Sequence, residues 1–179
     1  MITGASKSIR LFYLSRLGSF CCALTVTISG AASAAVLSAG GAWVAIDRGA
    51  SCEALTRSLR VATKDKLQAL AGLTFAADGR RWAEFHARLS RMPRGDASVM
   101  LKIGDQPFLL VARDGWAWSR GPQQAQAIVE ALRMTTTMSI ESRDQRGVRF
   151  SDPYLLDGAP TAIDSAAAQC ALRGAGKIR

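Results

Sequence analysis

The stretch from Gly121 to Cys170 constrains the fold most, because its pattern changes from helical to alternating and back to helical. Gly121-Pro122 suits a helix start, since proline at the first helical position gives up an amide that has no partner there. The apolar residues that follow at helical spacing are Ala125, Ile128, Val129 and Leu132. Together they form one apolar stripe along a helix.

Two strands are expected between the helices. Three consecutive threonines, residues 135–137, disfavour continuing the first helix because their branched β-carbons crowd the preceding turn. Met138 and Ile140 then alternate with polar residues, as in a half-buried strand. Residues 144–147 have turn chemistry, and a returning strand follows them.

A second helix closes the stretch. Thr161 is expected to cap its first turn, and Asp164 three residues later suits the helix dipole. The residues expected on its apolar face are Ile163, Ala166, Ala167 and Cys170. The helix therefore turns Cys170 toward the core.

The segment from Trp43 to Trp118 predicts mostly strands. Strand-like runs at 43–46 and 52–59 precede a short helix expected within 61–72, and turn pairs follow at Asp78-Gly79, Gly104-Asp105 and Asp114-Gly115. The predicted class is α+β: an antiparallel sheet, as a meander of short hairpins, with two helices late in the chain. One returning strand is expected to place four side chains on one face, namely Trp82, Glu84, His86 and Arg88.

Residues 1–34 are typical of a secretory signal peptide. Three basic residues precede a mostly apolar run at 17–28, and Ala32-Ser33-Ala34 is a small-x-small cleavage site. The alternative is an uncleaved membrane anchor, but the run is short and rich in Gly, Ser and Thr for a span of ~30 Å. Cleavage near Ala34/Ala35 would leave residues 35–179 as one globular domain, periplasmic or secreted, with no transmembrane anchor.

Two cysteines, Cys52 and Cys170, remain after residue 34. An even pair in an exported chain predicts a disulfide, which would join the early strands to the last helix. Two buried free thiols are the alternative.

The sequence contains no glycine pattern typical of nucleotide binding, and His86 is its one histidine. A serine nucleophile with His86 as base remains open, although no strand–turn–helix elbow surrounds a serine. A histidine on a mixed polar strand face is more often a solvated surface residue. We therefore expect no enzyme, no metal site and no cofactor.

Five arginines lie close together in the sequence: Arg80, Arg81, Arg88, Arg91 and Arg94. Guanidinium groups bind phosphate and carboxylate in forked geometry, and Trp82 could add a stacking or cation–π contact. The cluster, with Trp82 and His86, is thus a candidate surface for anionic lipid, acidic polysaccharide or a protein. The alternative is a solvated hairpin in a basic protein.

Two further observations bear on partners. Twenty basic residues against 14 acidic ones after residue 34 are too few for a dedicated nucleic-acid binder, so no specific nucleic acid is expected. Trp116 and Trp118 face the same way, and core or sheet packing is their expected role, since tryptophans generally bury most of their area.

Parts of the chain resemble a known family. "EALR" at 130–133, the threonine-rich strand and "YLLDGAPTAID" at 154–164 resemble the invasion-associated locus B family, small exported proteins of alphaproteobacteria. "IGDQPFLL" at 103–110 and the early Trp43 and Cys52 are compatible with it, so that the resemblance covers residues 43–172. It implies an envelope or host-interaction role without a catalytic residue set.

The sequence thus predicts an exported, disulfide-linked, non-enzymatic binding or accessory protein of the bacterial envelope. One alternative is a periplasmic hydrolase that uses His86. Another is an inhibitor or chaperone that binds an exported protein.

Overall fold

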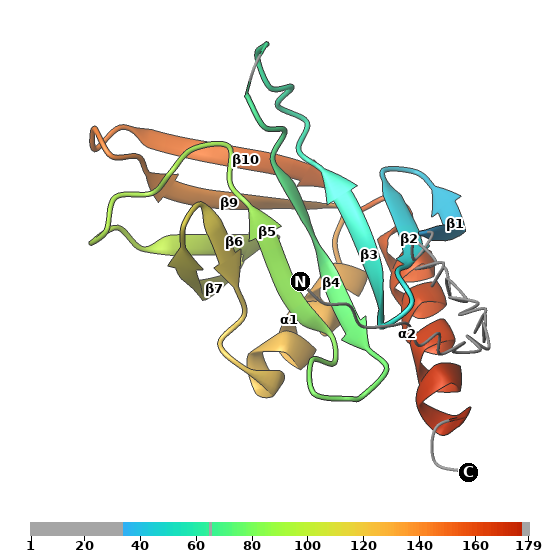
Figure 1. Ribbon diagram of the computed structural model, residues 1–179. Coiled ribbons are helices and arrows are strands. Elements are labelled where there is room, and N and C mark those ends of the chain that lie inside the picture. The colour runs from blue at the N-terminus through green and yellow to red at the C-terminus, as the bar shows by residue number, and fades with distance from the viewer. Residues whose placement is uncertain (1–33, 65, 177–179) are drawn as a thin grey trace, which may run out of the picture. The chain divides into compact units, whose positions relative to one another are not determined.

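The computed structural model describes residues 34–64 and 66–176, which form a ten-stranded antiparallel sheet and two helices (Figure 1). The strand order is β1-β2-β3-β4-β5-β8-β7-β6-β9-β10. The strands are β1 (Ala35–Gly40), β2 (Trp43–Asp47), β3 (Ser51–Arg57), β4 (Leu70–Ala76), β5 (Glu84–Arg88), β6 (Val99–Ile103), β7 (Gln106–Arg113), β8 (Trp116–Trp118), β9 (Thr137–Arg143) and β10 (Arg149–Leu155). The helices are α1 (Pro122–Arg133) and α2 (Ala159–Gly176). The expected antiparallel sheet with two late helices is confirmed.

Both helices pack on one face of the sheet. Helix α2 lies against β1 to β4, and α1 lies against β5, β6 and β7 and touches α2. Buried and partly exposed residues alternate along β3, β9 and β10, as expected when one face is covered and the other faces water. The covered face carries the core, and the opposite face, here called the open face, is free of helices.

The core is built from alternate strand residues and the apolar stripes of the helices. Its large, fully buried side chains include Leu73, Phe85, Leu101, Ile128, Ile140, Tyr154 and Ile163. The expected stripe of α1 is confirmed, since Ala125, Ile128 and Leu132 are buried and Val129 packs against the core. Gly121 precedes the helix and Pro122 begins it, as the sequence predicts.

A disulfide joins Cys52 of β3 to Cys170 of α2 and confirms the predicted pairing. The two α-carbons lie 5.8 Å apart, within the range that such bonds require. Both cysteines are fully buried. The bond therefore ties α2 to β3 and links two residues that are 118 positions apart in the sequence.

The last strand returns to the beginning of the domain. The backbone N–H of Leu59 donates to the carbonyl of Pro153 at 2.9 Å, and the Trp43 indole N–H donates to the carbonyl of Leu155 at 2.9 Å. Figure 1 shows β10 reaching the end of β3, although six strands lie between them in the sheet order. This approach brings the loop after β3 beside β10.

The prediction of a short helix within residues 61–72 is wrong. Described residues 58–69 are irregular, and β4 begins at Leu70. The Gln68 amide donates to the carbonyls of Ser58 and Arg60 and accepts from the Ala62 N–H, so it satisfies backbone groups that a helix would otherwise pair. Leu67 is 69 % exposed and so forms no apolar helix face with its neighbours.

Helix α2 begins at Ala159, two residues before the expected cap at Thr161. A tertiary contact sets this start. Gly158 has a φ of +84°, and a β-carbon there would lie 2.0 Å from the carbonyl oxygen of Gly40. The N–H of Ala42 also donates to the carbonyl of Asp157 at 2.9 Å. The β1–β2 turn thus holds the first turn of α2. The sequence pattern did not predict β1.

The expected signal peptide, residues 1–34, lies outside the described residues except for Ala34, and its cleavage stays a prediction. Within the described ranges, the structure contains no helix that is both long and apolar enough to span a bilayer.

Candidate functional site

The predicted arginine cluster is divided among separate places. Arg80 pairs with Asp78 at the β4–β5 turn, where its side chain is 87 % exposed. Arg81 lines a pocket on the open face with His86. Arg88 donates to the carbonyl of Gln68. Arg91 and Arg94 line a different, larger cleft. Proximity in sequence therefore did not produce one surface.

The expectation that Trp82 shares a face with His86 and Arg88 is wrong. Strand β5 begins only at Glu84, and Ala83 just before it has a φ of +57°, a left-handed conformation that breaks the alternation. Trp82 therefore lies on the helix side, with its ring edge-on to Phe75 at a centroid distance of 5.2 Å.

His86 is buried rather than solvated, with 9 % of its surface exposed. Its Nδ1 lies 3.2 Å from the Thr74 hydroxyl. Burial lowers the pKa of the imidazole, while the nearby carboxylates of Glu53 and Glu84 oppose that shift. Among the described residues, no group of three or more metal-ligating side chains is present.

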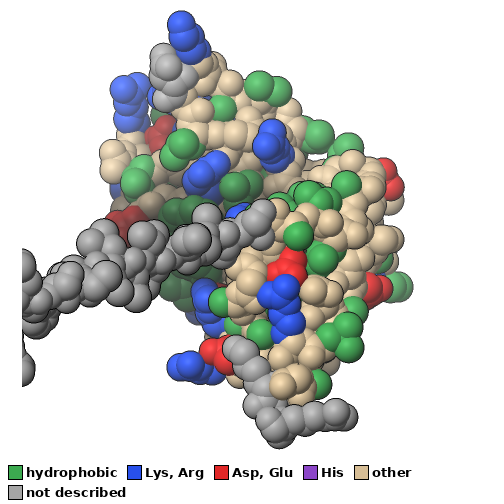
Figure 2. Space-filling model, turned by 45° about the vertical axis from the view of Figure 1, so that its right-hand side comes forward, with side chains coloured by type: hydrophobic (Ala, Val, Ile, Leu, Met, Phe, Trp, Pro, Cys, Tyr) green, Lys and Arg blue, Asp and Glu red, His purple; other side chains and the backbone are tan. Residues whose placement is uncertain are grey.

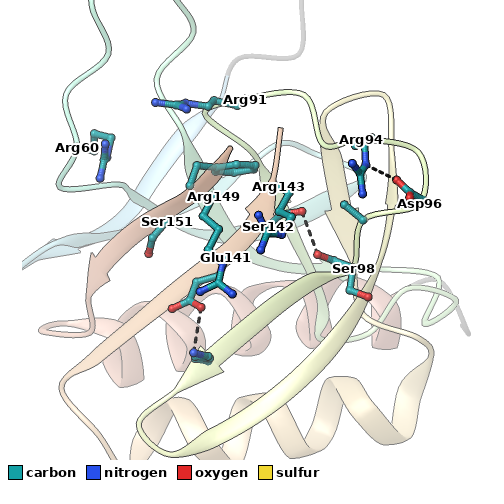
Figure 3. Close-up of a pocket in the computed structure, with 13 residues that line it drawn as sticks. Arg60, Arg91, Arg94, Asp96, Ser98, Glu141, Ser142, Arg143, Arg149 and Ser151 are labelled. Carbon is teal, nitrogen blue, oxygen red and sulfur yellow. Dashed lines mark hydrogen bonds and ion pairs between the residues drawn. The ribbon is translucent and has the colours of Figure 1, made fainter. Parts of the chain in front are cut away.

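The most basic cleft lies over β6, β9 and β10 and encloses about 860 Å³ (Figure 3). Six basic side chains and two carboxylates line it. The basic ones are Arg60, Arg91, Arg94, Lys102, Arg143 and Arg149. On the face shown in Figure 2, basic side chains are spread over the surface, some of them beside an acidic one. The cleft therefore has an excess of four basic side chains over carboxylates.

Arg143 and Arg149 form the centre of this basic cleft. They are directly opposite each other in the β9–β10 register, and both are exposed. Figure 3 shows their side chains next to each other on neighbouring strands. Like charges in directly opposed positions destabilise a strand pair. The register thus places two basic side chains side by side, and the Arg143 guanidinium also donates to the carbonyl of Gly147 at 2.8 Å.

Ion pairs neutralise only part of the cleft. Arg94 pairs with Asp96 at 2.5 Å, and Lys102 pairs with Glu141 at 2.9 Å. The guanidinium hydrogen bond lowers the pKa of Asp96, so that this carboxylate is charged at neutral pH.

A third pair lies at the rim, where Arg91 binds Asp144 at 3.1 Å. Burial opposes ionisation of Asp144, but N–H donation from Val148 and the Arg91 pair outweigh it and lower the pKa. Within the described ranges, Arg60, Arg143 and Arg149 have no carboxylate partner.

Sequence reasoning identified only Arg91 and Arg94 of this cleft. The pair Arg143 and Arg149 flanks the five-residue loop 144–148, whereas the expected turn at 144–147 would have placed Val148 opposite Arg143. Arg60 had no signal in the sequence, since it reaches the cleft only through the approach of β3 to β10.

A scan against protein-family models and searches of curated proteins and of solved structures gave no match. The functional argument therefore depends on the site itself.

Proposed function

We propose that this protein is an exported, non-enzymatic binding protein of the bacterial envelope, and that the basic cleft holds an anionic envelope component. The observation that carries the proposal is the directly opposed pair Arg143 and Arg149, which lies in the cleft without a carboxylate partner among the described residues.

Guanidinium chemistry supports an oxyanion as ligand. An arginine binds carboxylate or phosphate through two parallel N–H donors, and such charge-assisted bonds are stronger than neutral ones. An anion between Arg143 and Arg149 would replace repulsion with attraction, and Arg60 lines the same cleft. Phosphate-bearing lipid headgroups and acidic polysaccharides both present suitable groups.

Three observations support the export part of the proposal. Disulfides persist in oxidising compartments, and the Cys52–Cys170 bond is buried and well placed. Residues 1–34 have the pattern of a signal peptide, and the family resemblance implies an envelope role.

The proposal is tested by binding to phosphatidylglycerol vesicles and, separately, to soluble alginate. The double variant Arg143→Ser/Arg149→Ser should bind the true ligand at least tenfold more weakly, since each charge-assisted bond contributes about 1.5–3 kcal/mol. The matched control, Arg113→Ser/Arg120→Ser, removes the same charge from exposed positions outside the cleft. It should stay within about twofold of the native protein.

The two probes separate the possible sources of the anion. Vesicle binding alone indicates lipid headgroups, and alginate binding alone indicates a polysaccharide. Equal losses in both double variants would show that net charge and not the cleft causes binding. No binding of native protein to either probe at low salt would refute the proposal.

A further inference from the structure

A second site lies on the open face, around Trp116 and Trp118 of β8. Their strand neighbour Ala117 is fully buried in the core, so both rings point away from the helices. The two indoles are stacked, with centroids 6.4 Å apart and planes inclined by 19°. Both side chains remain partly exposed. Of the two expected roles, core or sheet packing, the rings therefore have the second, on the open face.

The pocket beside these rings encloses about 360 Å³ and lies over β3, β4, β5 and β8. Its polar side chains comprise two carboxylates, two guanidinium groups, a hydroxyl and an imidazole: Glu53, Glu84, Arg48, Arg81, Thr74 and His86. Arg48 pairs with Glu53, whereas Arg81 and Glu84 have no ion pair among the described residues. The pocket thus offers both hydrogen-bond donors and acceptors beside an apolar aromatic surface.

The pocket carries two carboxylates and two guanidinium groups, so its charges favour neither a cation nor an anion. A cationic ligand would compete with Arg88, whose guanidinium carbon already lies 5.9 Å from the Trp116 ring centre. An anionic ligand would meet the carboxylates of Glu53 and Glu84. A neutral ligand with one apolar face and several hydroxyl groups meets neither obstacle.

We infer that this pocket binds a neutral saccharide, with the C–H face of a sugar ring on Trp116 and Trp118. Sugar hydroxyls both donate and accept hydrogen bonds. The Glu84 carboxylate can accept from them, and the Arg81 guanidinium can donate to them. A volume of about 360 Å³ lies within the range of small-ligand pockets.

This site is separate from the basic cleft. Both lie on the open face, but they share no lining residue, and the cleft is built on β6, β9 and β10. Strand β7 lies between β8 and β6 in the sheet. The saccharide site can therefore fail its test while anion binding holds, and the reverse.

The test follows the four indole N–H resonances of the native protein by NMR during titration with cellotriose, maltotriose and the N-acetylglucosamine trimer. Single Trp→Phe variants assign the four signals. We expect saturable shifts of the Trp116 and Trp118 signals with at least one sugar. The signals of Trp43, which is 2 % exposed, and Trp82 on the helix side should stay in place.

The variant Trp116→Ala should weaken sugar binding at least tenfold. Trp82→Ala is the matched control, because it removes an indole that is 42 % exposed but lies elsewhere. It should bind the sugar as the native protein does. Both variants should bind phosphatidylglycerol vesicles and alginate as the native protein does.

Three outcomes would overturn the inference. The first is no shift with any of the three sugars up to about 10 mM, a concentration that would nearly saturate a site with a Kd of ~1 mM. The others are shifts centred on Trp82 and native sugar affinity in folded Trp116→Ala. If that variant does not fold, the indole titration of the native protein decides by itself.

Discussion

Removal of the Cys52–Cys170 disulfide should lower the free energy of unfolding by about 4–5 kcal/mol. A crosslink over a sequence separation of 118 residues restricts the unfolded chain, and the chain-entropy relation gives about 5 kcal/mol for a loop of this length. Both cysteines are fully buried, so the double variant Cys52→Ala/Cys170→Ala also leaves a small cavity. Relaxation of the native structure offsets part of these two losses of stability.

Urea unfolding measures this loss. For a domain of this size, with an m-value of ~2 kcal/mol/M, the midpoint should fall by roughly 2 M. The m-value itself should rise, because an unfolded chain without the crosslink exposes more surface. Native protein in reductant should follow the curve of the double variant, and reductant should leave the double variant unchanged.

Two results would refute this reasoning. One is a loss below about 1 kcal/mol with an unchanged m-value. The other is full alkylation of Cys52 and Cys170 in denatured, unreduced protein, as judged by mass spectrometry of the peptides that carry them.

Three further changes test the packing, each by urea or acid unfolding. Tyr154→Phe should be neutral or stabilising by up to about 1 kcal/mol, because the buried hydroxyl has no hydrogen-bond partner; a clear loss would reveal one. Gly158→Ala should cost about 2 kcal/mol or more, since its β-carbon would meet a backbone carbonyl at 2.0 Å. At Asp47, the N–H of Gly49 lowers the carboxyl pKa, against burial and with further help from side-chain donors. Ionised Asp47 therefore stabilises the fold above the unfolded pKa of about 4, and this stabilisation is lost as the pH falls through the lower pKa of the folded state. Asp47→Asn should reduce the loss of stability over that pH range.

The left-handed conformation of Ala83 offers a stability test of its own. Ala83→Val should lower stability by about 1 kcal/mol or more, because a branched β-carbon is strained at a φ of +57°. Ala83→Gly should not lower it by a similar amount. Equal losses in both variants would contradict this explanation of how Trp82 leaves the face of His86.

Local patterns were sufficient for much of the fold. Proline at the first helical position placed the start of α1 correctly. The strand expected from Cys52 and the apolar helix face of Cys170 were consistent with their bond. These signals act over a few residues, where spacing alone determines which side is buried.

Other features depend on single backbone conformations or on tertiary contacts, and spacing could not show them. Ala83 breaks an alternation that otherwise places Trp82 with His86, and Gln68 holds its loop through backbone groups as far away as Ser58. The basic cleft needs Arg60, which arrives through the approach of β3 to β10. Such positions are set by tertiary structure and not by local propensity.

Binding of an anion at the basic cleft is tested most directly by the arginine Nε–H resonances of the native protein during titration with alginate oligomers or phosphatidylglycerol bicelles. The signals of Arg143 and Arg149 should move first and saturably, and the movement should weaken as salt rises, because exposed charges are screened within ~8 Å at physiological ionic strength. Shifts confined to Arg80 or Arg113, or spread evenly over all arginines, would contradict a defined site in the cleft.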